Sequence, residues 1–489
     1  MDYFFVSYEK VRRYYEPIPG VPLDALAALA YVQRPGAVKE GTPFFLGPGM
    51  RPAEPLCSFF LELAKTVKAK SMQDYAYDAM DVVDFLEELD PPADLLSATE
   101  DDLLAYRQDC TELRESPDMP ATWKRRRVTI NSFYDWATDP RTKLLGERPY
   151  YRRSNGRDVL SWGATSELDV RHLTFRQWRF LKQVGLRGLL PNDRVDPAFR
   201  GQSPLRNSAG GELAITTGMR LQEFSCLFDI EVPAPRRDGS PAEVALQAIA
   251  KFGIPRVVAV QDATLGEIDM YRRTERAAMV RASARALSRR REELFVVSDI
   301  DLRRRKLTGM LDGRRRTFRI EAIPAATRRR AVFEGDQGLE PMALFVGRGG
   351  RMPTKTRWEQ IFEDAHVRSL QVSEKYACDV VMPQQLKIHD TRHTFAIYML
   401  QMLTQLVMRE EAERLREGGH GAFLADHISR NPLLILQGLL GHRSPKSTMR
   451  YLRYIRNTNA LVNKAIEEWN NQDETYVDYA SALVDKEAG

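Results

Sequence analysis

The sequence predicts an α+β fold that is mainly helical and carries a small β-sheet. Apolar residues recur at helical spacing through residues 54–140, which predicts a helical bundle. Two later stretches, 242–260 and 293–323, contain alternating or continuous apolar runs interrupted by turn residues, as in β-hairpins. Because 489 residues exceed what one ordinary hydrophobic core organises, we expect two to four domains.

The composition is that of a globular chain, with 43% hydrophobic and 28% charged residues. No apolar run of about eighteen residues occurs, and the N-terminus lacks a basic start followed by an apolar core, so we expect neither a membrane span nor a secretory signal. The cysteines form no C-x-x-C pair, which argues against a zinc site and a disulfide framework and favours a reduced, cytoplasmic protein. The net charge of +5 is compatible with a nucleic-acid partner without requiring one.

The N-terminal part divides by composition into three segments. Residues 1–53 are rich in Pro and Gly, which predicts an irregular arm with a single helix. Residues 54–140 predict four or five short helices, of which one opens with the capping-box pattern Thr99-x-x-Asp102. Residues 141–167 are polar and arginine-rich, which is typical of a linker.

Basic residues in these segments are candidate DNA contacts, since Lys and Arg bind phosphates. A solvated charged surface is the alternative. The candidates at the start of the last bundle helix and in the linker are Lys124, Arg125, Arg126, Arg127, Arg152 and Arg153.

The remaining part, residues 168–457, predicts a second domain of mixed helix and strand, and residues 281–330 are its most basic region. This region holds sixteen Lys or Arg against six Asp or Glu and contains an Asp-Gly turn between strand-like segments, which predicts a hairpin. Arg314, Arg315 and Arg316 follow that turn and are further candidates for DNA contact. The Gly-rich segment at 347–351 lacks the Lys-Ser/Thr of a Walker motif, so we expect no nucleotide site.

Residues 387–454 contain the candidate catalytic side chains that are closest together in the sequence. His389 and Arg392 are three residues apart, so on a helix their side chains point to one face. His442 follows an apolar run and a Gly, and Tyr451 follows a short basic segment. Arg grips a phosphate bidentately, His moves protons near neutral pH, and a tyrosine phenol can attack phosphorus. Each residue alone is more often a surface or packing residue, but together they predict a phosphate site.

The combined pattern resembles that of the tyrosine recombinase (phage integrase) family. HDTRHTFA and LLGHRSPKSTMRY match the H-x-x-R box, the L-G-H box and a Tyr nine residues after that His. TTGMRLQE resembles the first box, T-G-x-R-x-x-E-L, which supplies Arg220. The hairpin at 242–260 resembles the one that carries a catalytic lysine, G-K-G-x-K-x-R. It keeps the interval from Lys251 to Arg256 but departs at Ala250, Gly253 and Ile254.

The resemblance implies DNA strand transfer through a 3′-phosphotyrosyl intermediate, without metal, nucleotide or other cofactor. Two arginines would bind the non-bridging oxygens, one lysine would protonate the leaving 5′-oxygen, and the first histidine of H-x-x-R would accept the tyrosine proton. The second histidine would hydrogen-bond the phosphate. The implied residues are Tyr451 as nucleophile with Arg220, Arg392, Lys251, His389 and His442.

The resemblance also implies an architecture and partners. A helical core-binding domain (54–140) and a mixed α/β catalytic domain (168–457) would form a C-shaped clamp on double-stranded DNA, with dimers to tetramers assembling there. The C-terminal helix and tail (458–489) would dock on a neighbouring protomer, or pack against their own domain. Segments near 281–335 and 405–430 are longer than the family pattern and are expected to be insertions, and His420 and His427 in the second are expected at the surface.

Alternatives remain at three levels. Tyr454 is a competing nucleophile, although the nine-residue interval from His442 favours Tyr451. A type IB topoisomerase or a non-catalytic DNA-binding regulator could share the fold, although the H-x-x-R box and the complete residue set favour a recombinase. For the biological role, integration or transposition of a mobile element in a prokaryotic cytoplasm, with the protein on the nucleoid when bound to DNA, is favoured over dimer resolution and inversion.

Overall fold

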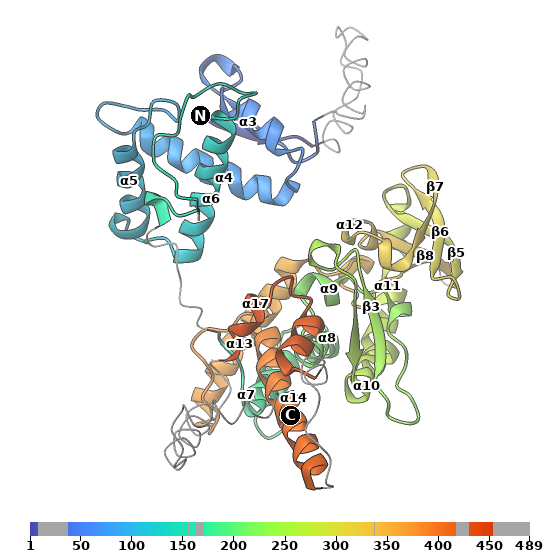
Figure 1. The fold of residues 1–489 in the computed structure, drawn as a ribbon. Helices are drawn as coiled ribbons and strands as arrows, with labels where there is room; N and C mark the ends of the chain where they lie inside the picture. The colour runs from blue at the N-terminus through green and yellow to red at the C-terminus, as the bar shows by residue number, and fades with distance from the viewer. Residues whose placement is uncertain (8–37, 155, 162–169, 337, 417–429, 453–489) are drawn as a thin grey trace, which may run out of the picture. The chain divides into compact units, whose positions relative to one another are not determined.

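The computed structural model describes residues 1–7, 38–154, 156–161, 170–336, 338–416 and 430–452. It divides into two compact units, residues 1–168 and 169–489, each with a hydrophobic core of its own (Figure 1). Helices dominate and the sheets are small, which confirms the predicted α+β class. The expected helices near 23–32 and 458–470 lie outside the described residues, as do His420, His427 and Tyr454.

The first unit is a helical bundle with a short β-ladder. Its Thr99–Asp102 capping box forms as predicted: the Asp102 amide donates to the Thr99 hydroxyl, and the Asp102 carboxylate accepts from the Thr99 amide. The elements are β1 (Asp2–Phe5), β2 (Pro43–Leu46), α3 (Leu56–Leu63), α4 (Ala69–Glu87), α5 (Glu100–Gln108) and α6 (Pro120–Ala137).

The strands β1 and β2 were not expected in the N-terminal arm. They pair antiparallel, with Asp2 opposite Leu46 and Phe5 opposite Pro43. Phe45 is fully buried against Phe60 of α3, with ring centroids 5.2 Å apart, whereas its neighbour Phe44 is exposed. Residues 43–46 therefore belong to the core of the helical unit, because burying Phe45 removes a large apolar surface from water.

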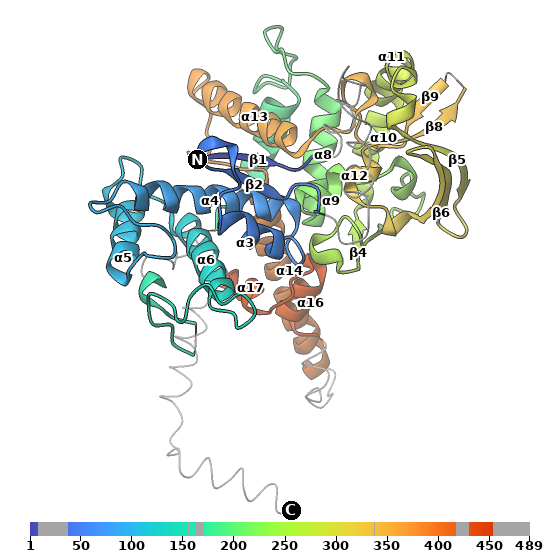
Figure 2. The same cartoon turned by 90° about the horizontal axis from the view of Figure 1, so that it is seen from above.

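The second unit contains two sheets among helices (Figures 1 and 2). Its helices are α7 (Phe175–Phe180), α8 (Pro204–Thr217), α9 (Leu221–Ser225), α10 (Asp262–Tyr271), α11 (Ala277–Ser288), α12 (Ala325–Arg328), α13 (Lys355–Lys375), α14 (His389–Arg416), α16 (Pro432–Leu440) and α17 (Lys446–Met449). Its strands are β3 (Ala242–Leu246), β4 (Arg256–Val260), β5 (Phe295–Asp301), β6 (Lys306–Leu311), β7 (Arg314–Arg319), β8 (Ala331–Gly335) and β9 (Gly338–Pro341).

Helix α8 is the centre of the main core. Its Gly210 and Gly211 let two tryptophans approach closely: a Cβ on Gly210 would lie 2.3 Å from the Trp358 ring, and one on Gly211 would lie 2.8 Å from the Trp178 ring. Trp358 lies on α13 and Trp178 on α7, so both helices pack tightly on α8. This packing fixes the C-terminal end of α8, where the first candidate arginine follows.

The strands β3 and β4 form the predicted antiparallel hairpin, with Ala242 opposite Val260 and Lys251 in the turn. The second sheet has the order β7-β6-β5-β8-β9. The predicted hairpin at 293–323 proves to be three strands, because β6 intervenes and the Asp312-Gly313 turn joins β6 to β7. This five-stranded sheet, named the inserted sheet here after the insertion expected near 281–335, lies to one side of the second unit, away from α14, α16 and α17 (Figures 1 and 2).

In the described part of the chain, no helix is both long enough and apolar enough to cross a bilayer.

One buried ion pair ties the inserted sheet to the main core. Arg328 and Glu231 are each 1% exposed, and Arg328 Nη2 donates to Glu231 Oε1 at 3.0 Å. The same guanidinium also donates to the carbonyls of Ile323, Ile320 and Cys226 and stacks on a phenylalanine ring. The chain thus surrounds this cation with acceptors, and the carboxylate alone neutralises its charge.

We expect Glu231→Ala to destabilise the second unit by about 3–5 kcal/mol, because it leaves a buried guanidinium without a counter-charge. Thermal unfolding followed by circular dichroism measures the change. Glu334→Ala is the matched control: it removes the exposed partner of Arg291, for which about 0–1 kcal/mol is expected. Equal shifts for the two variants would contradict the structural role of Arg328.

Candidate active site

The candidate site gathers residues from four places in the second unit: the α8–α9 junction, the β3–β4 turn, the start of α14 and the α16–α17 segment. Backbone carbonyls that close α8 and α16 accept hydrogen bonds from the two candidate arginines. Residues separated by more than two hundred positions in the chain therefore meet at one point.

Arg392 is the buried cation of the site. Its side chain lies on the first turn of α14, and its guanidinium donates to the carbonyl of Gly218 and, at 2.6 Å, to that of Leu440. Burial, followed by the charge of Arg220, lowers the pKa of Arg392 to about 9, so the group still carries its charge at neutral pH. A guanidinium has five N–H donors, so those not used on the carbonyls can bind an anion.

Arg220 reaches the same point from the α8–α9 junction. The chain turns there through Gly218, whose φ of 62° is left-handed and whose added Cβ would lie 2.3 Å from the Phe395 ring, so only glycine fits. Arg220 Nη2 donates to the Gly441 carbonyl at 3.2 Å, and Nη1 donates to Glu223 Oε1 at 3.1 Å. The turn therefore aims the guanidinium at the end of α16.

Glu223 pairs with two arginines of the site, Arg220 and Arg256. Its carboxylate is fully buried and accepts from the Arg220 amide at 2.7 Å, from Arg220 Nη1, and from Arg256 Nη1 at 2.9 Å. Burial alone would raise its pKa, but the hydrogen bonds and charge of Arg256 outweigh that effect, so the pKa of Glu223 lies below its ordinary value. In the sequence, Glu223 and Arg256 are only motif positions, and their positioning role appears in the structure.

Tyr451, the expected nucleophile, is 2% exposed and packs among apolar residues of α14 and α16. Its hydroxyl lies 2.9 Å from His393 Nδ1. Burial raises the pKa of the phenol, and the charge of Arg392 partly offsets this. A buried neutral phenol needs a nearby base to become a nucleophile.

His442 also lies beside the phenol ring. Its ring is nearly parallel to that of Tyr451, with centroids 6.5 Å apart and planes at 11°. His442 Nδ1 lies 2.9 Å from Thr448 Oγ1, which orients the ring. Loss of hydration, followed by the charges of Arg392 and Arg220, lowers the pKa of His442 to about 3, so its ring is neutral at physiological pH.

His389, which the family resemblance implies as the acceptor of the tyrosine proton, lies one helical turn before the histidine that contacts the phenol. The residue beside the phenol is His393, one helical turn further along α14, and within the described residues His389 makes no hydrogen bond to Tyr451. The His389 ring stands edge-on to the His393 ring, with centroids 4.8 Å apart and planes at 82°. The helical period explains this arrangement, because residues four apart lie on the same face.

Lys251 lies exposed at the β3–β4 turn, on the edge of the site. Its charge is near enough to His389 to contribute to that residue's lowered pKa, after loss of hydration and the charges of Arg392, Arg220 and Arg450. The six predicted catalytic residues and His393 therefore share one locality.

The basic residues predicted to contact DNA in the first unit differ in their availability. Arg125, Arg126 and Arg127 each pair with a carboxylate of their own unit, respectively Asp78, Asp81 with Asp118, and Asp158. Arg152 pairs with Asp135 at 3.2 Å. A phosphate would have to compete with these carboxylates. Lys124 and Arg153 are exposed, and their side chains have no ion pair within the described residues.

The arginines of β7 are freer. Arg314, Arg315, Arg316 and Arg319 are exposed on an edge strand, and in the part of the chain that the structure describes none of them has an ion pair. Other arginines of the same insertion are paired, including Arg291 with Glu334 at 2.6 Å and Arg330 with Asp312 at 2.6 Å. Strand β7 therefore presents uncompensated positive charge.

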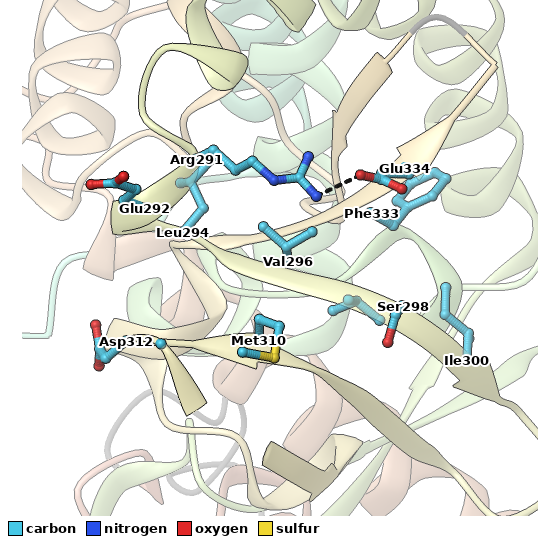
Figure 3. Close-up of a pocket in the computed structure, with 12 residues that line it drawn as sticks. Arg291, Glu292, Leu294, Val296, Ser298, Ile300, Met310, Asp312, Phe333 and Glu334 are labelled. Atoms are coloured by element: carbon cyan, nitrogen blue, oxygen red, sulfur yellow. Dashed lines mark hydrogen bonds and ion pairs between the residues drawn. The ribbon is translucent and has the colours of Figure 1, made fainter. Parts of the chain in front are cut away.

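The inserted sheet also holds a groove of about 850 Å³ (Figure 3). Apolar side chains, including Val296, Met310 and Ile300, line it, and the Arg291–Glu334 pair crosses one end. None of the candidate catalytic residues borders the groove, so the groove is separate from the candidate active site. Among the described residues, no group of three or more His, Cys, Asp or Glu side chains is arranged to hold a metal ion.

No protein-family model and no curated protein sequence matches this chain. Among solved structures, XerH site-specific recombinase bound to a palindromic difH substrate is 13% identical, with a TM-score of 0.46 over 86% of each chain. The Tn1549 transposon integrase with transposon right end DNA is 13% identical, with a TM-score of 0.44 over 85% of this chain and 99% of that one. A lambda integrase dimer bound to a core site is 11% identical, with a TM-score of 0.42 over 81% of this chain and 74% of that one. Similarities this low leave the functional inference to the residues of the chain itself.

We expect Glu223→Gln to lower the free energy of unfolding at pH 7 by about 3–5 kcal/mol, because Arg220 and Arg256 lose the fully buried carboxylate that pairs with both. The pKa of Glu223 is lowered in the folded state from an ordinary value of 4.5, so its stabilisation is complete above that pH and is lost as the pH falls through the folded-state pKa. The difference between wild type and variant should therefore shrink below about pH 4.5.

Urea unfolding at a series of pH values measures this difference. Glu363→Gln, at an exposed position on α13, is the control and should change little at any pH. A difference for Glu223→Gln that stays constant down to pH 3 would show that the carboxylate is not held by the arginines.

Proposed function

We propose that this chain is a tyrosine site-specific recombinase, which cuts and rejoins double-stranded DNA through a 3′-phosphotyrosyl intermediate. The observation that carries the proposal is the position of the Tyr451 hydroxyl, 2.9 Å from an imidazole nitrogen and in the field of Arg392 and Arg220. A phenol, a neutral base and two phosphate-binding cations are the groups that attack on a phosphodiester requires.

In the proposed reaction, the Tyr451 oxygen attacks phosphorus and the bond to the 5′-oxygen breaks. Arg220 and Arg392 bind the non-bridging oxygens and stabilise the charge that develops in the transition state. Lys251 protonates the leaving 5′-oxygen, and His442 hydrogen-bonds the phosphate. The phosphotyrosyl link keeps the energy of the phosphodiester, so a 5′-hydroxyl can reverse the step on another strand without nucleotide hydrolysis.

The backbone contacts of Arg220 and Arg392 support two properties that phosphate binding requires, a fixed position and unused N–H donors. The guanidinium groups are fixed before any phosphate arrives, because each donates to a backbone carbonyl at a helix end. They also keep unused donors, since two carbonyl contacts leave three of the five N–H groups of Arg392 for an anion. Preorganised donors of this kind stabilise a transition state without reorganising during the reaction.

The proposal extends to assembly and role. Exchange between two duplexes breaks four strands, and each Tyr451 can hold one, so the active assembly is a tetramer formed from dimers on DNA. The single-chain site is compatible with a role in integration or transposition of a mobile element, in the cytoplasm of a prokaryote. We also assign duplex contacts to the exposed basic residues, of which the β7 arginines and Lys124 are the least engaged.

We expect Tyr451→Phe to abolish the covalent protein–DNA adduct, because the nucleophilic oxygen is gone. The assay uses nicked suicide substrates made from the DNA flanking the gene, with denaturing gel electrophoresis as readout. Tyr454→Phe is the matched control and should keep adduct formation. An adduct that persists in Tyr451→Phe and disappears in Tyr454→Phe would show that Tyr454 is the nucleophile.

Wild-type protein that relaxes supercoiled DNA without forming Holliday junctions between paired sites would favour a topoisomerase. Wild-type protein that binds these sites and forms no adduct would indicate a non-catalytic regulator.

We expect the triple substitution Arg314→Gln, Arg315→Gln and Arg316→Gln to weaken DNA binding and to reduce the slope of log affinity against log salt by about 3, one unit for each lost phosphate contact. Fluorescence anisotropy at several salt concentrations measures the slope.

The matched control removes the same total charge from exposed arginines that already have carboxylate partners: Arg273→Gln, Arg291→Gln and Arg304→Gln. Equal effects of the two triple variants would mean that net charge, and not contact by β7, determines the affinity.

A further inference from the structure

The hydrogen bond between His393 and Tyr451 has a direction that the surrounding charges determine. His393 Nδ1 and the phenol oxygen are 2.9 Å apart, and one of the two groups must donate. Loss of hydration, followed by the influence of His389 and the charges of Arg450 and Arg392, lowers the pKa of His393 to about 3. The imidazole is therefore neutral. With the ring proton on Nε2, Nδ1 accepts from the phenol, which is the geometry of a base before proton transfer.

Resting on the proposed function, we propose that His393 is the catalytic base that takes the proton of Tyr451, and that occupation of the arginine pair by the scissile phosphate makes it basic enough to do so. His389, on the neighbouring helical turn, is then a positioning residue whose ring holds that of His393 edge-on. Binding of the scissile phosphate then activates the nucleophile Tyr451.

The proton and electron balance of the step is complete. The phenol O–H bond breaks and its proton moves to His393 Nδ1, while the phenol oxygen forms the bond to phosphorus. The bond from phosphorus to the 5′-oxygen breaks, and that oxygen takes a proton from Lys251. In the rejoining step, the attacking 5′-hydroxyl gives its proton to neutral Lys251 and the His393 imidazolium returns its proton to the leaving tyrosine oxygen, so the enzyme finishes in its starting state.

The groups facing His393 explain why phosphate is needed. His389 and Arg392 approach it from α14, Arg450 and Tyr451 from the segment after α17, and Arg171 from the segment before α7. Without DNA, these cations oppose an imidazolium. A phosphodiester between Arg220 and Arg392 adds negative charge, so the proton affinity of His393 rises when substrate is bound. The phosphate gains further negative charge in the transition state, which raises this proton affinity again.

Arg450 supports this arrangement independently. Its Nε is buried and, in the described part of the chain, has no hydrogen-bond acceptor. A buried donor of a charged group without an acceptor is unfavourable, so the site is more stable when an anion enters. Arg450 directly precedes Tyr451, which makes the phosphate that the tyrosine attacks the natural acceptor.

The first experiment compares single-turnover cleavage of a suicide substrate. We expect His393→Ala to lower the cleavage rate by about 10²–10⁴-fold while DNA affinity and thermal midpoint stay near wild type. The wild-type rate should level off above the titration midpoint of His393 in the DNA complex, whereas the variant rate should rise about tenfold per pH unit as the phenol itself ionises. A His393→Ala protein with the wild-type rate and pH profile would overturn the proposal.

A substrate with sulfur in place of the leaving 5′-oxygen separates the two proton transfers, because a thiolate leaves without protonation. It should restore cleavage by Lys251→Ala and leave His393→Ala slow. Restoration of both would place His393 on the leaving group and overturn the proposal. His389→Ala should lose less activity than His393→Ala, and the reverse order would return the role of base to His389.

The second experiment tests the phosphate dependence by NMR titration of isotope-labelled imidazoles in the slow Lys251→Ala protein. The His393 titration midpoint should rise when DNA with a native scissile phosphate binds. It should stay low with DNA carrying a neutral methylphosphonate at that position, and equal midpoints would refute the phosphate switch. Absence of any adduct with wild-type protein would instead refute the proposed function, so the two failures are distinguishable.

Discussion

The carboxylate of Glu223 is the interaction on which the site depends. It is fully buried and lies between the guanidinium groups of Arg220 and Arg256, while it also accepts the amide that opens α9. A buried ion pair is weak support for stability as a whole, but removing one partner leaves charge that nothing compensates. Glu223 therefore links the backbone of the α8–α9 junction to the direction of Arg220. Arg256 extends the link to β4, and its side chain lies beside Gly441 at the end of α16.

The other properties of the site arise because several cations lie close together where little water remains. Their charges, together with loss of hydration, keep the imidazoles of His393 and His442 neutral at physiological pH. Neutral imidazoles accept hydrogen bonds, and the phenol of Tyr451 supplies one of them. The same concentration of charge favours entry of an anion, because an anion relieves the repulsion that the folded chain holds in place. In the proposed reaction, phosphate recognition and nucleophile activation thus have a common electrostatic origin.

The arginines of this chain have two roles, and the role depends on whether the side chain is paired with a carboxylate. Where an arginine faces a carboxylate of its own unit, as Arg126 faces Asp81 and Asp118, it fixes the packing of helices. Where it has none within the described residues, as on β7, its charge is available to a partner. Edge strands also carry charged side chains to prevent pairing with other strands, so the β7 arginines would protect the sheet even without DNA. The two purposes are compatible, because phosphate binds side chains and leaves the strand edge unpaired.

The sequence by itself determined the helical first unit, the β3–β4 hairpin and the set of chemical groups, because local periodicity, turn residues and motif spacing carry that information. Spacing selected Arg392, His442 and Tyr451, and the structure brings them together. Only the tertiary structure decided which histidine touches the phenol. His389 and His393 lie on one face of α14, and the packing of Tyr451 against α14 and α16 places its hydroxyl on the second of them. Linear sequence could not distinguish partnered from free arginines, nor reveal β6 within its sheet, because both depend on contacts between distant residues.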